Sequence, residues 1–134
     1  MPVSRRALLV LAAIALVASA CATPGAPVPN ENTFAGVYSA TLPAASGGER
    51  AMTLTLNLDR TATLATRFTG REGDVIDRGT WSAVGYRLTV NLATTDDRRA
   101  PQRLTFDLRD DTLVPVEWNR SLWGEAGPGT YRRT

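Results

Sequence analysis

From Phe34 onward, apolar and polar side chains alternate with a period of two, which is typical of strands that bury one face. The longest alternation covers residues 51–69, and a tight turn at Asp59 and Arg60 divides it into the two strands of a predicted hairpin. We expect one face of this hairpin to be buried. That face carries Met52, Leu54, Leu56 and Leu58, and the second strand continues the alternation with Ala62, Leu64, Thr66 and Phe68.

The rest of the chain repeats this pattern in short segments that turns separate. Further strands are predicted at residues 75–81, 86–92, 104–108, 113–118 and 130–133. Turns or loops lie between them, at residues 70–73, 84–85, 94–101, 110–111 and 124–129. No segment in this region shows the 3.6-residue period of an amphipathic helix. The pattern therefore predicts an all-β antiparallel meander of seven or eight strands.

A single open sheet would leave its apolar face in water, whereas a barrel or a sandwich hides that face and removes the edges. Between these two, we expect a small lipocalin-like barrel over residues 34–134. The alternating outward positions carry mainly Thr and Arg, which suit water and not lipid. The sequence therefore does not predict a membrane-spanning barrel.

Residues 1–20 have the features of a bacterial secretory signal. Arg5 and Arg6 precede an apolar run over residues 7–18, and Ala18-Ser19-Ala20 supplies small residues for cleavage. Cys21 follows directly and is the one cysteine of the chain. This arrangement resembles the lipobox of bacterial lipoproteins, although Ala18 stands where such sites favour Leu. The resemblance implies a signal peptide over residues 1–20, transfer of a diacylglycerol group to the Cys21 thiol, and acylation of the new N-terminus with a palmitate-type chain.

Two alternatives to a lipid anchor remain open. The chain could be an ordinary secreted protein with a free thiol at Cys21, although an unpaired cysteine is unusual in an oxidising compartment. An uncleaved membrane anchor is the second alternative, but a helix needs about 20 apolar residues to cross the hydrocarbon core. The residue after the cysteine is Ala22. It is not the Asp that would resemble an inner-membrane retention signal of enteric bacteria, so we expect the periplasmic face of the outer membrane. Residues 21–33 contain Pro24, Pro27 and Pro29 and predict a disordered tether.

The charge of the chain excludes a simple nucleic-acid binder. The formal charge of +2 comes from Arg5 and Arg6, so the chain beyond the signal is neutral. A basic surface that could attract a phosphate backbone is therefore not expected, and we predict no nucleic-acid partner. The membrane contact that we expect runs through the lipid anchor alone.

The residue inventory also excludes the common catalytic systems. The chain has no His, no Lys and one Cys, so it cannot form a Ser-His-Asp triad, a Schiff base or a His/Cys metal cluster. The paired carboxylates Asp96-Asp97 and Asp110-Asp111 lie at predicted turns, where we interpret them as solvated residues. Asp74 and Asp77 lack the ligand density of a calcium loop. We expect no enzyme activity, no cofactor and no metal site.

Several motifs resemble the N-terminal domain of the NlpE family of outer-membrane lipoproteins. The motifs that carry the resemblance are Leu42-Pro43, the alternating strand at residues 52–57, and Asp59 with Thr61. In addition, Gly79-Thr80-Trp81 matches a Gly-Thr-Trp of that family. The resemblance covers about residues 34–92. It implies a small β-rich domain and a role in copper homeostasis or envelope stress.

One departure from the family pattern changes what the resemblance implies. Where the family has Cys-x-x-Cys, this chain has Ala44 and Gly47. The thiol pair is the obvious soft ligand for copper. The resemblance therefore implies a shared fold without the copper site.

Two classes of function remain, and a third is less specific. The chain is either an NlpE-like interaction or envelope-stress sensor module, or a lipocalin-like carrier of a small apolar ligand; an inhibitor of a cell-wall enzyme is the third. The candidate contact residues are Trp81, Tyr86, Trp118, Arg120 and Trp123. If they line an open barrel, a carrier is favoured. If Trp118 and Trp123 lie outside beside Arg120, a protein partner is favoured, because Trp and Arg are enriched at binding hot spots. They could also simply fill a barrel core.

Overall fold

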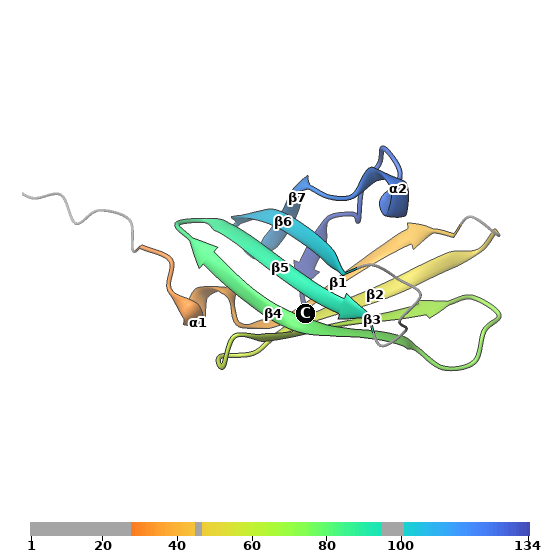
Figure 1. Ribbon diagram of the computed structural model, residues 1–134, viewed down its shortest axis with the longest axis horizontal. Coiled ribbons are helices and arrows are strands. Elements are labelled where there is room, and N and C mark those ends of the chain that lie inside the picture. The colour runs from red at the N-terminus through yellow and green to blue at the C-terminus, as the bar shows by residue number, and fades with distance from the viewer. Residues whose placement is uncertain (1–27, 45–46, 95–100) are drawn as a thin grey trace, which may run out of the picture.

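The computed structural model describes residues 28–44, 47–94 and 101–134, and these residues form a closed antiparallel barrel (Figure 1). Eight strands follow one another around the barrel in chain order: β1 (Gly36–Pro43), β2 (Glu49–Leu56), β3 (Thr61–Phe68), β4 (Val75–Val84), β5 (Arg87–Thr94), β6 (Gln102–Arg109), β7 (Thr112–Glu117) and β8 (Tyr131–Arg133). Two one-turn helices accompany them, α1 (Glu31–Phe34) and α2 (Arg120–Trp123). The predicted all-β meander and its closure into a barrel are confirmed.

The strand register brings the inward faces of neighbouring strands into line. On β2, for example, Leu54 lies opposite Tyr38 of β1 and Leu64 of β3. Alternation then buries one side chain in two along each strand, and these side chains meet inside the barrel. The buried apolar side chains form one cluster, made of Phe34, Tyr38, Ala40, Met52, Leu54, Leu56, Ala62, Leu64, Trp81, Leu88, Val90, Leu92, Leu104, Phe106, Leu108, Leu113 and Tyr131.

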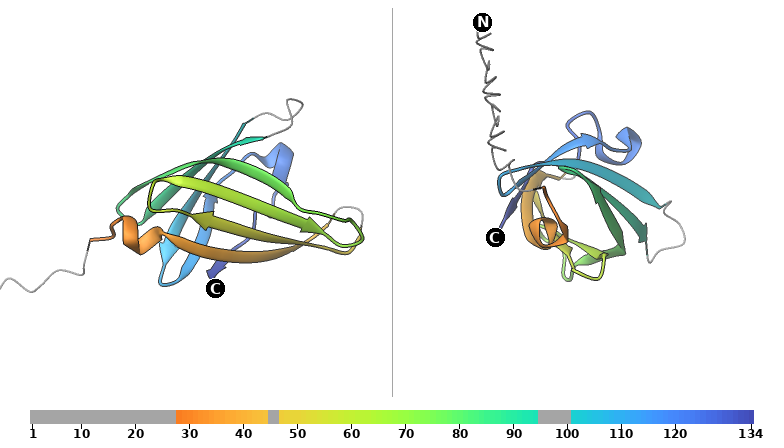
Figure 2. Two further views of the ribbon diagram at one scale, coloured as in Figure 1. Left: turned by 90° about the horizontal axis from the view of Figure 1, so that it is seen from below. Right: turned by 90° about the vertical axis from the view of Figure 1, so that its left-hand side faces the viewer.

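The two ends of the barrel differ. At one end, which we call the α1 end, helix α1 lies across the barrel opening, together with the turns that join β2 to β3 and β4 to β5 (Figure 2). The other end, which we call the mouth, is where strands β1, β3, β5 and β7 end. Helix α2 lies beside the mouth. The seam of the barrel is short, because β8 pairs with two residues of β7 and two of β1.

The expectation that Leu58 is buried was wrong. Strand β2 ends at Leu56, and Leu58 is 57% exposed in the following turn. Hydrogen bonds from Asn57 N to Thr61 O and from Arg60 N to Asn57 O close a three-residue loop, in which Arg60 has a positive φ of 71°. Because the alternation of faces holds only within a strand, it stops two residues before Leu58.

Three further expectations need correction at element ends. Tyr86 is not the first residue of a strand but the second of the β4–β5 turn, and β5 begins at Arg87. The predicted tether does not extend to Thr33, because residues 31–34 are helical. Helices α1 and α2 were missed, since one turn is too short to show a helical stripe.

Some expectations fall on residues that the structure does not describe. Cys21, the signal at residues 1–20, most of the tether and the pair Asp96-Asp97 lie outside the described ranges. Within residues 28–44, 47–94 and 101–134, no helix has the length and hydrophobicity needed to span a membrane.

Candidate functional site

Trp81, the first candidate contact residue, closes the α1 end of the barrel from inside. Only 2% of it is exposed, its ring centroid lies 6.0 Å from that of Phe34, and its Nε1–H donates to Asn57 O at 2.8 Å. The Arg60 guanidinium carbon lies 4.6 Å from the ring centroid on the outer side. Trp81 is therefore a core residue whose polar atom is satisfied, and not a free binding surface.

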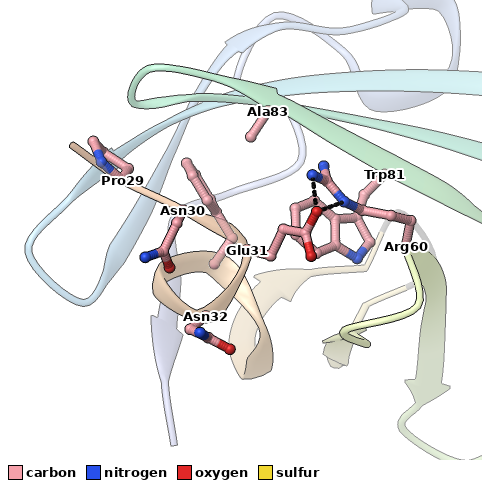
Figure 3. A pocket seen from close by; sticks show the side chains of 8 residues that line it. Pro29, Asn30, Glu31, Asn32, Arg60, Trp81 and Ala83 are labelled. Atoms are coloured by element: carbon pink, nitrogen blue, oxygen red, sulfur yellow. Dashed lines mark hydrogen bonds and ion pairs between the residues drawn. The ribbon is translucent and has the colours of Figure 1, made fainter.

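A surface hollow of about 390 Å³ lies between α1 and this end of the barrel (Figure 3). Glu31 and Arg60 face each other across it and form an ion pair, in which Arg60 Nε lies 3.1 Å from Glu31 Oε1. Both side chains are substantially exposed, so this pair contributes little to stability. Because its two charged groups neutralise each other, the hollow offers no unpaired charge to a ligand.

Arg133 of β8 holds α1 in place. Its guanidinium donates to the carbonyl oxygens of Ala35 at 2.7 Å and Thr33 at 2.6 Å, and to the Tyr38 hydroxyl at 2.6 Å. The Tyr38 hydroxyl in turn donates to Phe34 O at 2.8 Å. Burial raises the pKa of Tyr38 and the nearby Arg133 charge opposes this shift, so the hydroxyl stays protonated and can donate. The network satisfies carbonyls that a helix end leaves without partners.

Tyr86 lies at the α1 end, as Trp81 does, and away from Trp118 and Trp123. It is 52% exposed in the β4–β5 turn, whereas Trp118 and Trp123 belong to the segment that leaves β7 at the mouth. The structure therefore does not join Tyr86, Trp118 and Trp123 into one surface.

At the mouth, Trp123 of α2 packs against the buried core and contacts two polar residues. Its Nε1–H donates to Gln102 Oε1 at 3.0 Å, and the guanidinium carbon of Arg50 lies 5.0 Å from its ring centroid. Behind them, the buried Tyr131 hydroxyl donates to Met52 Sδ at 3.4 Å. Burial raises the pKa of Tyr131, and the positive charge of Arg50 acts in the opposite direction. We call Arg50, Gln102 and Trp123 the mouth cluster.

Sequence reasoning found Trp123 but missed Arg50 and Gln102. A signal for Arg50 was present, because it stands in phase with Met52, Leu54 and Leu56 on the apolar face of the alternating strand. A charged residue at such a position must point into the barrel. Gln102 is 8% exposed and gave no comparable signal, since it lies at the end of a loop.

Trp118 and Arg120 lie beside the mouth cluster on the outside. The Trp118 Nε1–H donates to Gly124 O at 2.9 Å, and its ring packs so closely on Gly127 that a Cβ there would lie 2.8 Å away. Trp118 lines a surface hollow of about 350 Å³, together with Gln102 and Arg103. Arg120 is exposed and pairs with Glu125 at 3.4 Å. Trp118, Arg120 and Trp123 are thus brought near one another around α2.

Among the described residues, no group of three or more His, Cys, Asp or Glu side chains could hold a metal ion. Asp74 pairs with Arg67 at 2.7 Å, and Asp77 is buried on the inner face of β4. Asp111 of the β6–β7 turn pairs with Arg133 at 3.2 Å. Asp74, Asp77 and Asp111 therefore lie in different surroundings: Asp74 and Asp111 each pair with an arginine, and Asp77 is buried.

The β1–β2 loop holds the positions where the resemblance places a thiol pair. Ala44 N donates to Gly48 O and Gly47 N donates to Ala44 O, both at 3.0 Å. Backbone hydrogen bonds therefore close this loop at the mouth, where neither Ala44 nor Gly47 provides a side-chain ligand.

Comparison with known proteins agrees with the motifs and with the barrel. Residues 38–119 match the family model described as the NlpE N-terminal domain, and this match covers more than half of the chain. A search of curated proteins and a search of solved structures found no match. The matched range begins in β1 and ends just after β7, so it includes most of the barrel and both the β1–β2 loop and Trp118. The chain belongs to the NlpE N-terminal domain family.

Proposed function

We propose that this chain is a lipid-anchored protein of the bacterial envelope whose barrel acts by contacting another protein, as an interaction or stress-sensing module without the copper site of its family. Membership of the NlpE family supports an envelope location. Cys21 after a small-residue site supports acylation and retention at the periplasmic face of the outer membrane. We assign no catalytic activity, because the chain has no His, no Lys and no second Cys.

The interior of the barrel is filled with side chains, and this observation favours an interaction module over a ligand carrier. Large side chains that are at most 1% exposed occupy its length, from Phe34 at the α1 end to Tyr131 and Met52 below the mouth. The hollows described above lie on the outer surface and not in the core. A carrier would instead need a preformed apolar cavity of about 300 Å³ or more inside the barrel.

The position of the anchor would orient the barrel on the membrane. Cys21 lies a few residues before Val28, and the chain then enters the fold through α1. Anchoring at Cys21 would hold the α1 end near the membrane and turn the mouth, with α2, toward the periplasm (Figure 2). The exposed Leu122 of α2 and the exposed Tyr86 of the β4–β5 turn would then lie at opposite ends.

The anchor itself is tested by replacing Cys21 with serine. The variant should lose its acyl chains and leave the membrane fraction, or fail to be processed, because several acyl chains are needed for stable anchoring. Mass spectrometry of the native protein reads the modification directly. An unmodified Cys21, or a leader still attached, would contradict the lipid anchor.

Protein contact is tested in living cells with a photo-reactive amino acid at one position at a time. We expect Leu122 at the mouth to cross-link to an envelope protein, and Tyr86 at the membrane-proximal end to give no such product. Tyr86 is the matched control, since the two side chains are similarly exposed, at 46% and 52%. Cross-linking from neither position would count against an interaction module, and a tightly bound apolar molecule in the purified protein would favour the carrier.

A further inference from the structure

Arg50 is a cation that points into the barrel at its mouth, and among the described residues it has no ion-pair partner. Its side chain lies on the inward-facing side of β2, as those of Met52 and Leu54 do, and it is only partly buried. Its Nε is fully buried and has no hydrogen-bond partner. The ion pairs found among the described residues do not include Arg50, although they include Arg60, Arg67, Arg87, Arg120 and Arg133.

This arrangement is costly for the free protein. A buried N–H group without an acceptor loses its hydrogen bond to water and gains none in return. The Trp123 ring, 5.0 Å from the guanidinium carbon, stabilises the charge through its π face but accepts no conventional hydrogen bond. Since Trp123 is fixed by its own hydrogen bond to Gln102, the guanidinium that lies over its ring is held in place. A site of this kind is prepared for an anion.

We propose that the mouth cluster is a carboxylate-binding site, in which the Arg50 guanidinium pairs with a carboxylate that a partner protein presents on an acidic segment. The planar fork of a guanidinium matches the two oxygens of a carboxylate in a bidentate pair. Trp123 forms the apolar wall of the site, and Gln102 fixes the orientation of that wall.

The filled core favours a protein segment over a fatty acid as the source of the carboxylate. Directly below Arg50, Met52 is 1% exposed and Tyr131 is not exposed at all, and their side chains bond to each other. Among the described residues, the side chains directly below Arg50 therefore leave no room for an acyl chain attached to the carboxylate. A carboxylate on a protein surface needs no such depth, since only its head group enters the mouth.

The charges around the mouth favour a local contact over a broad electrostatic surface. Arg103 lines the hollow beside Gln102 and Trp118, and would attract further acidic residues of the same segment. Glu117 lines that hollow too. Because this carboxylate opposes a long acidic stretch, binding should depend on Arg50 far more than on total charge.

The inference deepens the proposed function, since it assigns the partner a chemistry, but the carboxylate site can be tested without the partner. The full chain, purified in mild detergent, is titrated with the peptide acetyl-tetraglutamate amide, and binding is followed by calorimetry. In parallel, the Arg50 Nε–H resonance is followed by NMR. The neutral peptide acetyl-tetraglutamine amide and the small carboxylate hexanoate serve as comparison ligands.

We expect saturable binding of the acidic peptide, a shift of the Arg50 Nε–H resonance, and at least a tenfold loss of affinity in Arg50→Gln. Arg78→Gln is the matched control, because Arg78 is exposed on the outer wall of β4 and its replacement removes the same charge. Arg50→Lys keeps the charge without the fork and should bind more weakly than the native chain. If Arg50→Gln does not fold, the Arg50→Lys titration and the native resonance shift still decide.

Three results would overturn the inference. They are equal affinity for the acidic peptide in the Arg50→Gln and Arg78→Gln variants, no peptide binding at millimolar concentration, and tighter binding of hexanoate than of the peptide. The proposed function is tested separately, by the cross-link at Leu122. Peptide binding through Arg50 without a cross-link at Leu122 would keep the carboxylate site and remove the interaction module. A cross-link at Leu122 with peptide binding that ignores Arg50 would do the reverse.

Discussion

At the scale of single residues, Leu56 and Leu58 show how far an alternating pattern can be followed. Both lie in one unbroken apolar–polar alternation, yet Leu56 is 2% exposed and Leu58 is 57% exposed. The difference arises in the backbone, because Arg60 takes a left-handed conformation that closes the hairpin before Leu58 can pair. Arg is not a residue that marks such a conformation in a sequence, whereas Gly or Asn would.

The pair supplies a matched test of the inward face. Leu56→Asp should lower the free energy of unfolding by about 4 kcal/mol, because it buries a carboxylate among apolar side chains. Leu58→Asp makes the same chemical change in an exposed turn and should alter stability by less than about 0.5 kcal/mol. Urea denaturation followed by Trp fluorescence measures both. Equal effects of the two substitutions would show that the assigned faces are wrong.

At the scale of elements, strands β2 to β8 were predicted from the sequence, whereas β1 and the two helices were not assigned. The predicted strands can be recognised locally, as β5 can from Leu88, Val90 and Leu92, because the period of two needs only neighbouring residues. Helix α1 begins with the capping pair Asn30 and Thr33, but it has a single turn. What holds it is Arg133, a residue about one hundred positions away, and no local pattern reveals such a contact.

This dependence predicts that Arg133→Ala frees α1 from the barrel. The substitution removes three hydrogen bonds from a charged donor and leaves two partly buried carbonyls without these partners, which should cost about 2–3 kcal/mol. Hydrogen exchange should then speed up in residues 31–38 more than elsewhere. Arg132→Ala is the control, because Arg132 is the exposed neighbour on the same strand. Unchanged exchange at α1 in the Arg133 variant would mean that the helix docks without it.

At the scale of the whole molecule, closure of the barrel could be argued from sequence, but the content of its mouth could not. Closure follows from the need to hide one apolar face and both edges. The mouth cluster, in contrast, joins β2, β6 and α2, and depends on the exact placement of a helix that the pattern did not show. Arg50 alone stood out as a charge in an inward phase, and only the structure shows Trp123 above it.

The residues available in the whole molecule also determine whether it can form the copper site that the resemblance to the family suggests. Cu(I) selects thiolate and thioether sulfur, and the chain after Cys21 has no Cys or His, with Met52 as its one thioether. Met52 is 1% exposed, and its sulfur already accepts a hydrogen bond from Tyr131, so it cannot reach a metal at the surface. We therefore predict that the Cys21→Ser protein, which lacks the remaining thiol, binds no Cu(I) in the presence of a competing chelator.

The matched gain-of-function control restores the thiol pair in the same protein. Ala44→Cys with Gly47→Cys places two soft ligands in the β1–β2 loop, three residues apart, and should bind one Cu(I) that survives the chelator. Gly47 has a positive φ of 85°, so the new cysteine strains the loop, and the circular dichroism spectrum must confirm that the barrel persists. Stoichiometric Cu(I) binding before the thiols are added would overturn the prediction, because it would require ligands other than sulfur or imidazole. Binding only after they are added would show that the barrel retains the loop geometry of a metal site and that the two side chains at positions 44 and 47 decide whether it is used.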